Sequence, residues 1–512
     1  SVWERTNPRP HRKVQGRTPM MHGHGKSDRP IVPTKPPNEA EPEAKEAVEG
    51  RGLAKGKTPE RNMSRTQSRM SMCSALERIR QAARRDRGQR FTALRHQVYG
   101  MERLRAAYFG LKRGAAPGID GATWRQYQEG LERNLVALSE RIKRGAYRAQ
   151  PVRRAYIAKA DEPRKLRALG VLVREDKIVQ RATAEVLSCL YEQDFVRFSY
   201  GFRPGRSPHQ ALDALSVEIT QRKVNWVLDA DIRGFFDTLD HGWLVKFIEH
   251  RVADRRVVRL IQKWLKVGVL EEGKHIDTEM GTVQGESISP LLANLYLHYG
   301  FDLWVQQWRR MKAQGEVIVV RFADDFVVGF EHREDGERFL SELVERLRRF
   351  GLELHAQKTR LIEFGRQAEE DRQSRGEAKP ETFNFLGFTH SGAKTRKGRF
   401  VVLRQTRRKR WQSKLKEVKA ELRRRMHTPV AAMGQYVRSV ILGYMRYYAV
   451  PMNAVSVSAF RMAVGRLWWR VLKRRSQKAR VSRAQMERRM ARWVPQTHVC
   501  HPYPWQRFGV IT

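Results

Sequence analysis

Hydrophobic and polar positions alternate along this chain with two different periods, which predict both helices and strands. Apolar residues recur at spacings of three and four in SALERIRQAARR, YGMERLRAAYFGLKRG and WRQYQEGLERNLVALSERIKRG, as they do in amphipathic helices. Between residues 151 and 173 the pattern changes to short runs typical of strands, VRRAYIAK and LRALGVLV, and a helix is expected over about 176–191. After about Arg404 the chain is predicted to be helical and basic to near Trp493.

The central part of the chain, residues 225–390, alternates strands and helices but includes hairpins. NWVLDADIRGFFDTLDH predicts a strand that opens into a turn and helix, and GTVQGESISPLLANLYLHYGF predicts a Gly-rich turn followed by a helix. A helix is expected around 334–350, and GLELHAQKTRLIEF and FNFLGFTH are typical of strands. This order predicts an α+β fold with a ferredoxin-like antiparallel sheet in preference to a doubly wound parallel one.

One hairpin within this region carries charge where charge is unexpected. In VIVVRFADDFVVGF, two apolar strands, Val317–Ala323 and Phe326–Phe330, are separated by Asp324 and Asp325 alone. Two residues form the shortest hairpin connection, and turns of that length favour Asn-Gly or Asp-Gly. Adjacent aspartates therefore need an explanation other than turn geometry.

Asp231, at the end of the strand WVLDAD, supplies a partner for this pair if both strands belong to one sheet. Three carboxylates that close repel by about 1–4 kcal/mol per pair, which a bound divalent cation would offset. Oxygen ligands with room for water and phosphate suit Mg²⁺, and two such ions can activate a 3′-hydroxyl and stabilise a leaving pyrophosphate. The alternative is that Asp231 caps the next helix and the aspartate pair forms a solvated turn.

Charge and composition limit the kinds of molecule that this chain is expected to bind. The 512 residues carry a net charge of +45, and residues 391–512 alone hold 30 Lys and Arg against three acids. No apolar run approaches 18 residues, so nucleic acid is a better partner for this charge than a membrane. Aromatic residues are interleaved with the basic ones in ILGYMRYYAV and RLWWRVLKRR, which favours RNA or single-strand binding over a merely solvated basic surface.

Two further features concern the cellular setting and the start of the chain. Cys73, Cys189 and Cys500 are far apart and predict neither a zinc site nor a disulfide framework, which suits a reducing cytoplasm. Residues 1–62 contain nine of the 21 prolines and no apolar periodicity, so we expect this basic leader to be disordered.

The chain resembles group II intron-encoded reverse transcriptases/maturases of the bacterial type. The matching segments follow one another as GAAPGIDG, RALGVLVREDKIVQRA, SYGFRPGRSPHQAL, DADIRGFFDTLDH, GTVQGESISPLLANLYLH, RFADDF, GLELHAQKTR, FNFLGF and ILGYMRYY. The resemblance covers about residues 70–512 and implies a right-hand polymerase fold. Its regions would be an N-terminal extension and fingers over 63–225, a palm over 226–390, and an α-helical thumb/maturase domain over 400–512.

The resemblance also implies roles for individual residues. Asp231, Asp324, Asp325 and the backbone carbonyl of Ile232 would hold two Mg²⁺ ions, or Mn²⁺ in their place. Lys358 would protonate the pyrophosphate, although a plain surface lysine is an alternative. The nucleotide would be bound by Lys159, Arg167, Phe236, Gln284 and Gly285. RNA contacts would come from Arg203, Arg206, Tyr444, Tyr447, Tyr448, Trp468 and Trp469.

Some of these roles have competing interpretations. Phe236 would exclude a 2′-hydroxyl from the incoming sugar, or it is a core aromatic beside Phe235. Arg203 and Arg206 are template contacts or ordinary surface arginines. The segment AKADEPRKLRALGV departs from the family pattern, which affects the roles of Lys159 and Arg167. Glu286 stands where the family commonly has glycine and places an acid near the nucleotide.

The function that this resemblance implies is RNA-directed DNA synthesis combined with assistance to intron splicing. The implied partners are intron RNA, an RNA template with a DNA primer, dNTPs and target DNA, with no membrane and no obligatory protein partner. His498, Cys500 and His501 are too few and too crowded for the family's endonuclease metal site, so none is expected. The alternatives are a reverse transcriptase recruited by the host, for instance for phage defence, and a splicing cofactor whose polymerase has decayed.

Overall fold

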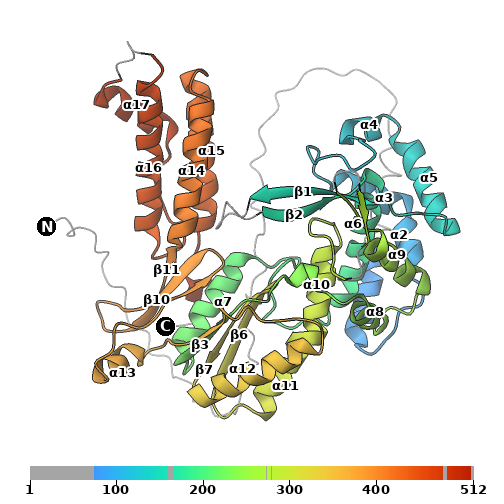
Figure 1. The fold of residues 1–512 in the computed structure, drawn as a ribbon, viewed down its shortest axis with the longest axis horizontal. Helices are drawn as coiled ribbons and strands as arrows, with labels where there is room; N and C mark the ends of the chain where they lie inside the picture. Colours follow the sequence, from blue (N-terminus) through green and yellow to red (C-terminus); the bar gives the residue numbers. More distant parts are fainter. Residues whose placement is uncertain (1–73, 159–165, 272–273, 278–279, 477–480, 509–512) are drawn as a thin grey trace, which may run out of the picture.

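The computed structural model describes residues 74–158, 166–271, 274–277, 280–476 and 481–508. The predicted leader 1–62 and Lys159 lie outside these residues. Figure 1 shows the first helices gathered on one side of the molecule, a sheet with its helices in the middle, and three long helices, α14–α16, side by side on the other. Among the described residues, none of the helices combines the length and apolarity that a membrane crossing needs.

The central sheet is the palm, and its topology confirms the predicted ferredoxin-like arrangement. Its strands lie in the order β6-β7-β3-β8, and every neighbouring pair is antiparallel. Along the chain, helices separate β3 from β6 and β7 from β8, which is the β-α-β-β-α-β order of a split unit. The strands are β3 (Trp226–Ala230), β6 (Val317–Phe322), β7 (Asp325–Phe330) and β8 (Arg360–Glu363).

Both faces of the palm sheet are covered, which explains why β6 and β7 are continuous apolar runs. On one face, alternate residues such as Val319 and Val328 pack in a core with Phe339 and Leu343 of α12 (Arg333–Arg348). The helices α10 (Ser289–Leu297) and α11 (Leu303–Met311) contribute to the same core. On the other face, residues such as Val320 and Val327 form a second core with α7 (Pro208–Gln221) and with β9–β11.

The fingers lie beside the palm and are mainly helical. The predicted helix near 176–191 is confirmed as α6, and the predicted strands near 151–173 are confirmed as β1 and β2. These two strands belong to a sheet of order β2-β1-β4-β5. The fingers elements are α2 (Arg95–Tyr99), α3 (Met101–Phe109), α4 (Trp124–Glu129), α5 (Leu131–Arg144), β1 (Val152–Ala158), β2 (Leu166–Val171) and α6 (Arg174–Tyr191). Four elements from the range 226–390, which was predicted as palm, lie with them (Figure 1): α8 (His241–Glu249), α9 (Arg255–Lys266), β4 (Val269–Glu271) and β5 (Lys274–Ile276).

The thumb follows the palm through a small antiparallel sheet of order β11-β10-β9. Its helices pack around a separate core that includes Val437, Phe460 and Trp468, so the predicted helical region is confirmed apart from its first residues, which form β11. The elements are α13 (Ala368–Ser374), β9 (Phe383–Phe385), β10 (Phe388–Lys394), β11 (Phe400–Thr406), α14 (Arg408–Arg424), α15 (Val430–Tyr448), α16 (Ala454–Lys473), α17 (Arg483–Trp493) and α18 (Pro504–Arg507).

Buried ion pairs join the thumb to the palm. Asp213 on α7 is 2% exposed and accepts hydrogen bonds from Arg404 of β11 and Arg507 of α18, each at 2.5 Å. A carboxylate buried with two guanidinium groups is satisfied only while all three elements stay together. The joint therefore orients the thumb relative to the sheet that carries the aspartates.

One predicted strand is shorter in the structure than its pattern indicates. Within GLELHAQKTRLIEF, only Arg360–Glu363 forms a strand, and Leu354 makes an isolated bridge to Ile232. The intervening residues form a turn in which the amides of Lys358 and Thr359 donate to the carbonyl of His355. This turn, which the alternating pattern did not predict, brings Lys358 beside Asp231.

Candidate active site

The register of the aspartate hairpin differs by one residue from the prediction. Phe322 pairs directly with Asp325, so the two-residue turn is Ala323–Asp324, and Asp325 is the first residue of β7. Ala323 has a φ of +57°, a left-handed conformation that a residue with a Cβ adopts only at a free-energy cost. The side chain of Asp325 is therefore directed by the pleat of the sheet, whereas Asp324 lies in the turn itself.

The strand register brings Asp231 to this hairpin, as predicted. Ala230 of β3 pairs with Phe326 of β7, so Asp231 follows one step further along, opposite Asp325. Opposed residues in an antiparallel pair project from the same face, as do residues two apart on one strand. Asp229, which pairs with Val327, therefore lies on the same face as Asp231 and Asp325. Asp229 was not predicted as a site residue, although its position two residues before Asp231 in a strand was the available signal.

Burial, with a smaller contribution from neighbouring carboxylates, raises the pKa values of Asp325, Asp324 and Asp229. Desolvation, together with Asp324, Asp231 and Asp229, raises the pKa of Asp325 to about 7. Desolvation also raises the pKa of Asp324, with Asp231 adding to the effect and Arg167 opposing it. Desolvation and, less strongly, Asp231 raise the pKa of Asp229 to about 6. A face with this much unfavourable negative charge favours bound cations.

Carboxylates are suitable ligands for a divalent metal, although their side chains are not arranged as a complete ligand set. Carboxylate oxygens are the ligands that Mg²⁺ prefers. In the part of the chain that the structure describes, no three His, Cys, Asp or Glu side chains converge as ligands of one ion. Instead, Lys358 Nζ lies 2.5 Å from Asp231 Oδ2 and neutralises that carboxylate. The predicted ligands Asp231, Asp324 and Asp325 are thus adjacent in the sheet without being gathered around a point.

The backbone beside Asp231 is fixed by a bridge between Ile232 and Leu354. His355 N donates to the carbonyl of Asp231 at 2.7 Å, and Arg233 N donates to that of Glu353 at 2.8 Å. Ile232 itself is buried at 3% exposure, and the role of its carbonyl as a metal ligand stays a prediction.

Phe236, predicted to exclude a 2′-hydroxyl, packs against the loop that begins at Gly281. It is half-buried in a short 3-10 helix, Phe235–Asp237, with its ring edge-to-face against Phe235 at 5.4 Å between centroids. Its carbonyl accepts from Thr282 N at 2.7 Å. Gly281 has a φ of +83°, and a Cβ there would lie 2.8 Å from the same carbonyl. The loop that carries Gln284 thus packs against Phe236.

The same loop also contacts the strand that carries Arg167. Gly170 N donates to the carbonyl of Gln284 at 2.7 Å. Gly285 has a φ of +109°, and a Cβ at this position would lie 3.0 Å from the carbonyl oxygen of Gly170. Glycine is therefore required here for the packing of the loop on β2. Arg167 opposes the rise in the pKa of Asp324, so this arginine interacts with the turn through charge, and the loop connects its strand to Phe236. Lys159 lies outside the described residues, and the binding of nucleotide by the predicted residues stays a prediction.

Glu286, which departs from the family pattern, adds no charge to this region at neutral pH. Its side chain is buried at 5% exposure and accepts from Ser289 Oγ at 3.3 Å. Burial raises its pKa to about 8. The carboxyl is therefore mostly protonated at pH 7 and acts as a neutral polar group behind the loop.

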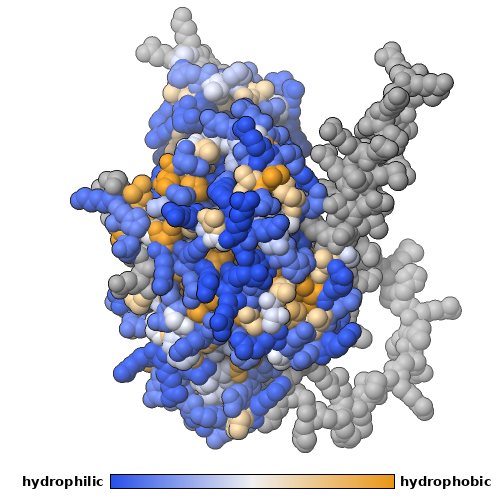
Figure 2. All heavy atoms as spheres, turned by 90° about the vertical axis from the view of Figure 1, so that its right-hand side faces the viewer, coloured by the Kyte–Doolittle hydropathy of each residue, from blue (hydrophilic) through white to orange (hydrophobic). Residues whose placement is uncertain are grey.

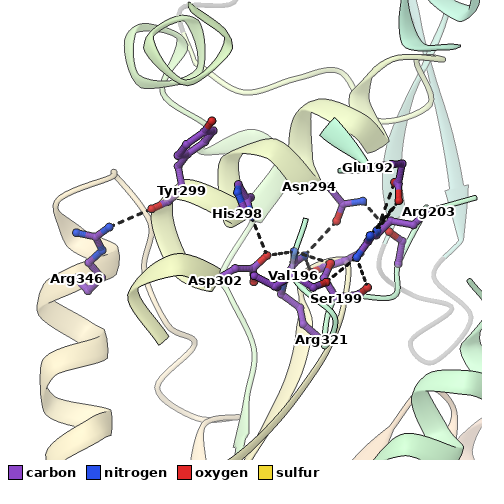
Figure 3. A network of polar contacts seen from close by, with 12 residues as sticks. Glu192, Val196, Ser199, Arg203, Asn294, His298, Tyr299, Asp302, Arg321 and Arg346 are labelled. Atoms are coloured by element: carbon purple, nitrogen blue, oxygen red, sulfur yellow. Dashed lines mark hydrogen bonds and ion pairs between the residues drawn. The ribbon is translucent and has the colours of Figure 1, made fainter. Parts of the chain in front are cut away.

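A buried arginine that was not predicted as a site residue, Arg321, donates to the backbone of the aspartate turn. Figure 3 shows it in a polar network with Asp302, Asn294 and Ser199. Arg321 is completely buried and forms two hydrogen bonds with Asp302, at 2.7 and 2.5 Å. Its Nη1 donates to the carbonyl of Ala323 at 2.8 Å and to Asn294 Oδ1 at 3.1 Å, and its Nη2 donates to Ser199 Oγ at 2.8 Å. A charged residue within the apolar run VIVVRF was the available signal, since a fully buried arginine requires a partner.

Arg203 belongs to the same network and is not a template contact. It is 7% exposed, forms an ion pair with Glu192 at 3.0 Å, and donates to the carbonyls of Val196 and Ser199 at 2.7 and 2.8 Å. The prediction for Arg203 is wrong because all of its donors face the protein. Arg206 is partly exposed, stacks over Tyr200 at 5.1 Å and donates to the carbonyl of Arg197, so its predicted RNA contact stays a prediction.

Of four predicted thumb aromatics, two are core residues and two are half-buried. Trp468 is fully buried and Tyr444 is 6% exposed, stacked on Phe460 at 3.7 Å between centroids, so the prediction that these two rings bind RNA is wrong. Both rings pack in the apolar core between the thumb helices. Tyr447 and Tyr448 are half-buried at the joint with β9–β11, where Tyr447 Oη donates to the carbonyl of Leu386.

Trp469, a predicted RNA contact, and His501 have different surroundings. Trp469 is half-buried with Lys473 over its ring at 4.4 Å, so its RNA contact stays a prediction. His501 stacks on His209 at 3.7 Å between centroids and pairs with the carbonyl of Arg446, which makes it part of the thumb–palm contact.

Comparison with known proteins is consistent with this geometry. Residues 157–390 match the family of the reverse transcriptase (RNA-dependent DNA polymerase), so the chain contains a reverse transcriptase domain. Group II intron-encoded protein LtrA of Lactococcus lactis subsp. cremoris is 36% identical over 223 residues, 44% of this chain and 37% of LtrA. Protein YkfC of Escherichia coli (strain K12) is 34% identical over 242 residues, 41% of this chain and 62% of YkfC.

A third relative, nuclear intron maturase 1 (mitochondrial) of Arabidopsis thaliana, is 28% identical over 92 residues, 18% of this chain and 13% of that protein. The resemblance to group II intron-encoded reverse transcriptases/maturases that the motifs indicate is thereby confirmed. The aligned part of the chain spans less than two thirds of the length of each of these relatives.

Proposed function

We propose that this protein copies RNA into DNA by Mg²⁺-dependent nucleotidyl transfer and that it also binds its intron RNA to assist splicing and mobility. The observation that carries the polymerase part is the row of carboxylates, Asp231, Asp325 and Asp229, on one face of the palm sheet, with Asp324 in the adjoining turn. The similarity of residues 157–390 to reverse transcriptases supports the same reaction.

The chain's own residues divide the work. Asp231, Asp324, Asp325 and the carbonyl of Ile232 would hold the ions, which lower the pKa of the attacking hydroxyl and neutralise the leaving group. Lys358 would exchange its bond to Asp231 for one to the pyrophosphate, because a cation that enters the site takes over the neutralisation of Asp231. The Lys358 ammonium is then free to donate a proton to the departing oxygen.

The nucleotide would be held by the elements that converge on this row. Arg167 on β2 would pair with the triphosphate, and the contact of the Gln284–Gly285 backbone with Gly170 of the same strand supports this role. The ring of Phe236 would occupy the space beside C2′ of the incoming sugar. Lys159 would add a second cation to the triphosphate site.

Exposed cations support the RNA-binding part of the proposal. On the thumb, the charge that the sequence places in residues 391–512 reaches the surface at many exposed positions, which include Arg408, Lys409, Lys416, Lys419, Arg423, Arg438, Arg446, Arg466, Arg470, Lys473, Arg474 and Arg488. Binding to such a surface displaces counterions from RNA and is strongly salt-dependent.

A second basic surface lies on the fingers, and the sequence argument did not single it out. The buried positions of α9 are apolar, whereas Arg255, Arg256, Arg259, Lys263 and Lys266 are exposed. With Arg148, the last three line a groove of about 490 Å³. Figure 2 shows this side of the molecule, where hydrophilic residues cover most of the surface. RNA that contacts both the fingers and the thumb would span the palm.

The direct test combines two assays on one preparation. With primer, RNA template, dNTPs and Mg²⁺, the protein should make cDNA, and a chelator should abolish the product. With its own flanking intron at low Mg²⁺, it should raise the splicing rate. Absence of cDNA on several templates would contradict the polymerase and favour a splicing cofactor. Normal cDNA synthesis without any effect on splicing would favour the host-recruited reverse transcriptase.

A further inference from the structure

The loop Ser199–Arg203 runs along the edge of the palm sheet and extends it beside the aspartate turn. Tyr200 N donates to the carbonyl of Arg321 at 2.8 Å, and Arg321 N donates to the carbonyl of Phe198 at 2.9 Å. Ser199 thus forms a parallel bridge with Arg321 on β6. The loop is therefore positioned by the strand that ends in the turn.

The backbone of this loop is held tightly on both sides of Phe202. Asn294 Nδ2 donates to the carbonyl of Gly201 at 2.6 Å, and a Cβ on Gly201 would lie 2.1 Å from Ala323 N. On the other side, Arg203 is anchored by Glu192 and two carbonyls (Figure 3). Gly201 and Arg203 are buried, so the loop has no freedom to move away from the turn.

Phe202 contradicts ordinary folding preferences in two respects. Its φ is +56°, which is unfavourable for a residue with a Cβ, and its side chain is 56% exposed although it is a large apolar ring. Such strain persists where the surroundings determine it, and it clusters at functional sites. A residue that gains little from burial and costs free energy in its backbone points to a contact with another molecule.

The position of the ring points to a substrate of the candidate active site. Its centroid is 6.3 Å from that of Phe322, which pairs with Asp325 on the same face as Asp231. With strands about 4.8 Å apart, the Cα of Phe322 is roughly 10 Å from that of Asp231. Phe202 is therefore close enough to reach the first few base pairs of a duplex whose 3′ end lies at the aspartates.

We propose that Phe202 contacts the primer–template hybrid, with its ring against the apolar surface of sugars and bases in the first few base pairs. This inference rests on the proposed polymerase function, since that function places the duplex at the aspartates. The ring carries no charge or hydrogen-bonding group, so the contact is independent of sequence and insensitive to salt, unlike the basic surfaces.

The test uses two substitutions that remove the Phe202 ring, a third, Phe202→Trp, that keeps an aromatic ring, and one matched control. Phe202→Ala removes the ring, and Phe202→Gly removes the ring and also relieves the positive φ. Phe109→Ala removes an equally exposed phenylalanine, 54% exposed at the end of α3 in the fingers. For each protein, the Kd for a labelled RNA–DNA hybrid, the nucleotides added per binding event and the Tm are measured.

We expect both Phe202 variants to bind the hybrid about tenfold more weakly and to add fewer nucleotides per binding event. Their salt dependence should equal that of the unmodified protein, and Phe202→Gly should have an equal or higher Tm. Phe109→Ala should behave like the unmodified protein. Phe202→Trp should retain the affinity of the unmodified protein, because tryptophan also presents a flat apolar ring.

Unchanged affinity in both variants would overturn the proposal, as would a drop in Tm for Phe202→Gly that accounts for the loss of binding. The proposed polymerase activity is tested separately, by measuring cDNA synthesis with the unmodified protein. If that protein makes no cDNA and yet binds the hybrid through Phe202, the reaction fails and the contact stands. If it makes cDNA while the variants bind normally, only the contact fails.

Discussion

The palm and the thumb both contain residues that differ in character from their neighbours in sequence, but for opposite physical reasons. In the palm, Asp325 and Arg321 interrupt apolar strands, and both lie at or directly behind the candidate active site. In the thumb, Trp468 and Tyr444 stand close to exposed arginines in the amphipathic helices α16 and α15, and both are core residues. A charge in a buried strand demands a specific partner, whereas an aromatic ring in a helix is satisfied by any well-packed apolar neighbour.

The largest effect should come from the aspartate turn itself. Asp324→Ala combined with Asp325→Ala removes two carboxylates of the row and should lower the rate of cDNA synthesis by at least about 10³-fold, because metal-ion stabilisation contributes several kcal/mol. Binding of intron RNA, measured on the same preparation, should change by less than about twofold, since the exposed cations of the thumb are unaltered. Equal loss of both activities in a folded variant would show that palm and thumb are not separable.

Arg321→Met should affect both stability and rate. It leaves Asp302 buried without its partner, which typically costs about 3–5 kcal/mol in the free energy of unfolding. Adding Asp302→Leu removes the unpaired charge and should recover much of that stability. Primer extension should stay about 10²-fold slower in the double variant, because the carbonyl of Ala323 has lost its donor and the turn is no longer held in place. Full recovery of the rate would make Arg321 purely structural.

Phe236→Ala tests a palm residue that is half-buried and so has both a core and a site interpretation. Removing the ring opens space beside C2′, and the ratio of rNTP to dNTP incorporation should rise by about 10- to 100-fold. The measurement is single-nucleotide extension with each substrate in parallel. A fall in Tm with an unaltered ratio would identify the ring as packing alone.

Two neighbouring thumb residues sharpen the comparison within one helix. Arg470→Gln removes an exposed cation and should reduce the slope of log K against log salt for intron RNA by roughly 0.7–0.9. Trp468→Ala should lower the free energy of unfolding by about 3–5 kcal/mol and leave that slope unaltered in the folded protein. If the tryptophan variant alone changed the slope, the ring would be an RNA contact after all.

The smallest effect is the pH dependence of the metal-free protein. The pKa of Asp325 is raised to about 7 from the usual 3.8, so the folded state binds this proton more tightly than the unfolded state does. The stabilisation from the protonated carboxyl is complete below about pH 4 and is lost as the pH rises through 7. Asp325→Asn should therefore gain stability relative to the unmodified protein over this window and level off above pH 7. Urea unfolding without metal at several pH values measures the difference.

Much of the fold could be predicted from local sequence pattern, because helices and hairpins form mainly between residues that are close together in the chain. Two apolar strands separated by two residues can only form a hairpin, and WVLDAD has the alternation of a strand that ends in a carboxylate. The fingers helix α6 and the helical thumb followed from the spacing of their apolar residues. The glycines 281 and 285 were recognised by motif, and their positive φ angles give the physical reason for that motif.

Other features were settled only when distant segments met. Whether the turn comprised Asp324–Asp325 or Ala323–Asp324 depended on the pairing of β6 with β7, and a shift of one residue reverses the face on which a side chain lies. Burial decided the roles of Arg203, Tyr444 and Trp468, because a polar or aromatic residue has the same local pattern whether it meets protein or RNA. Arg321 was visible in the sequence, but its partner Asp302 lies on another element.

The sequence by itself therefore determined the class of fold, three of the four carboxylates of the candidate site and the excess of positive charge, since each of these is a property of residue type and spacing. Only the tertiary structure decided which side chains reach the surface, which aspartates share a face, and that a strained Phe202 lies beside the turn. These depend on contacts between residues such as Gly201 and Ala323, more than 100 positions apart, whose free energy exists only once the chain has folded.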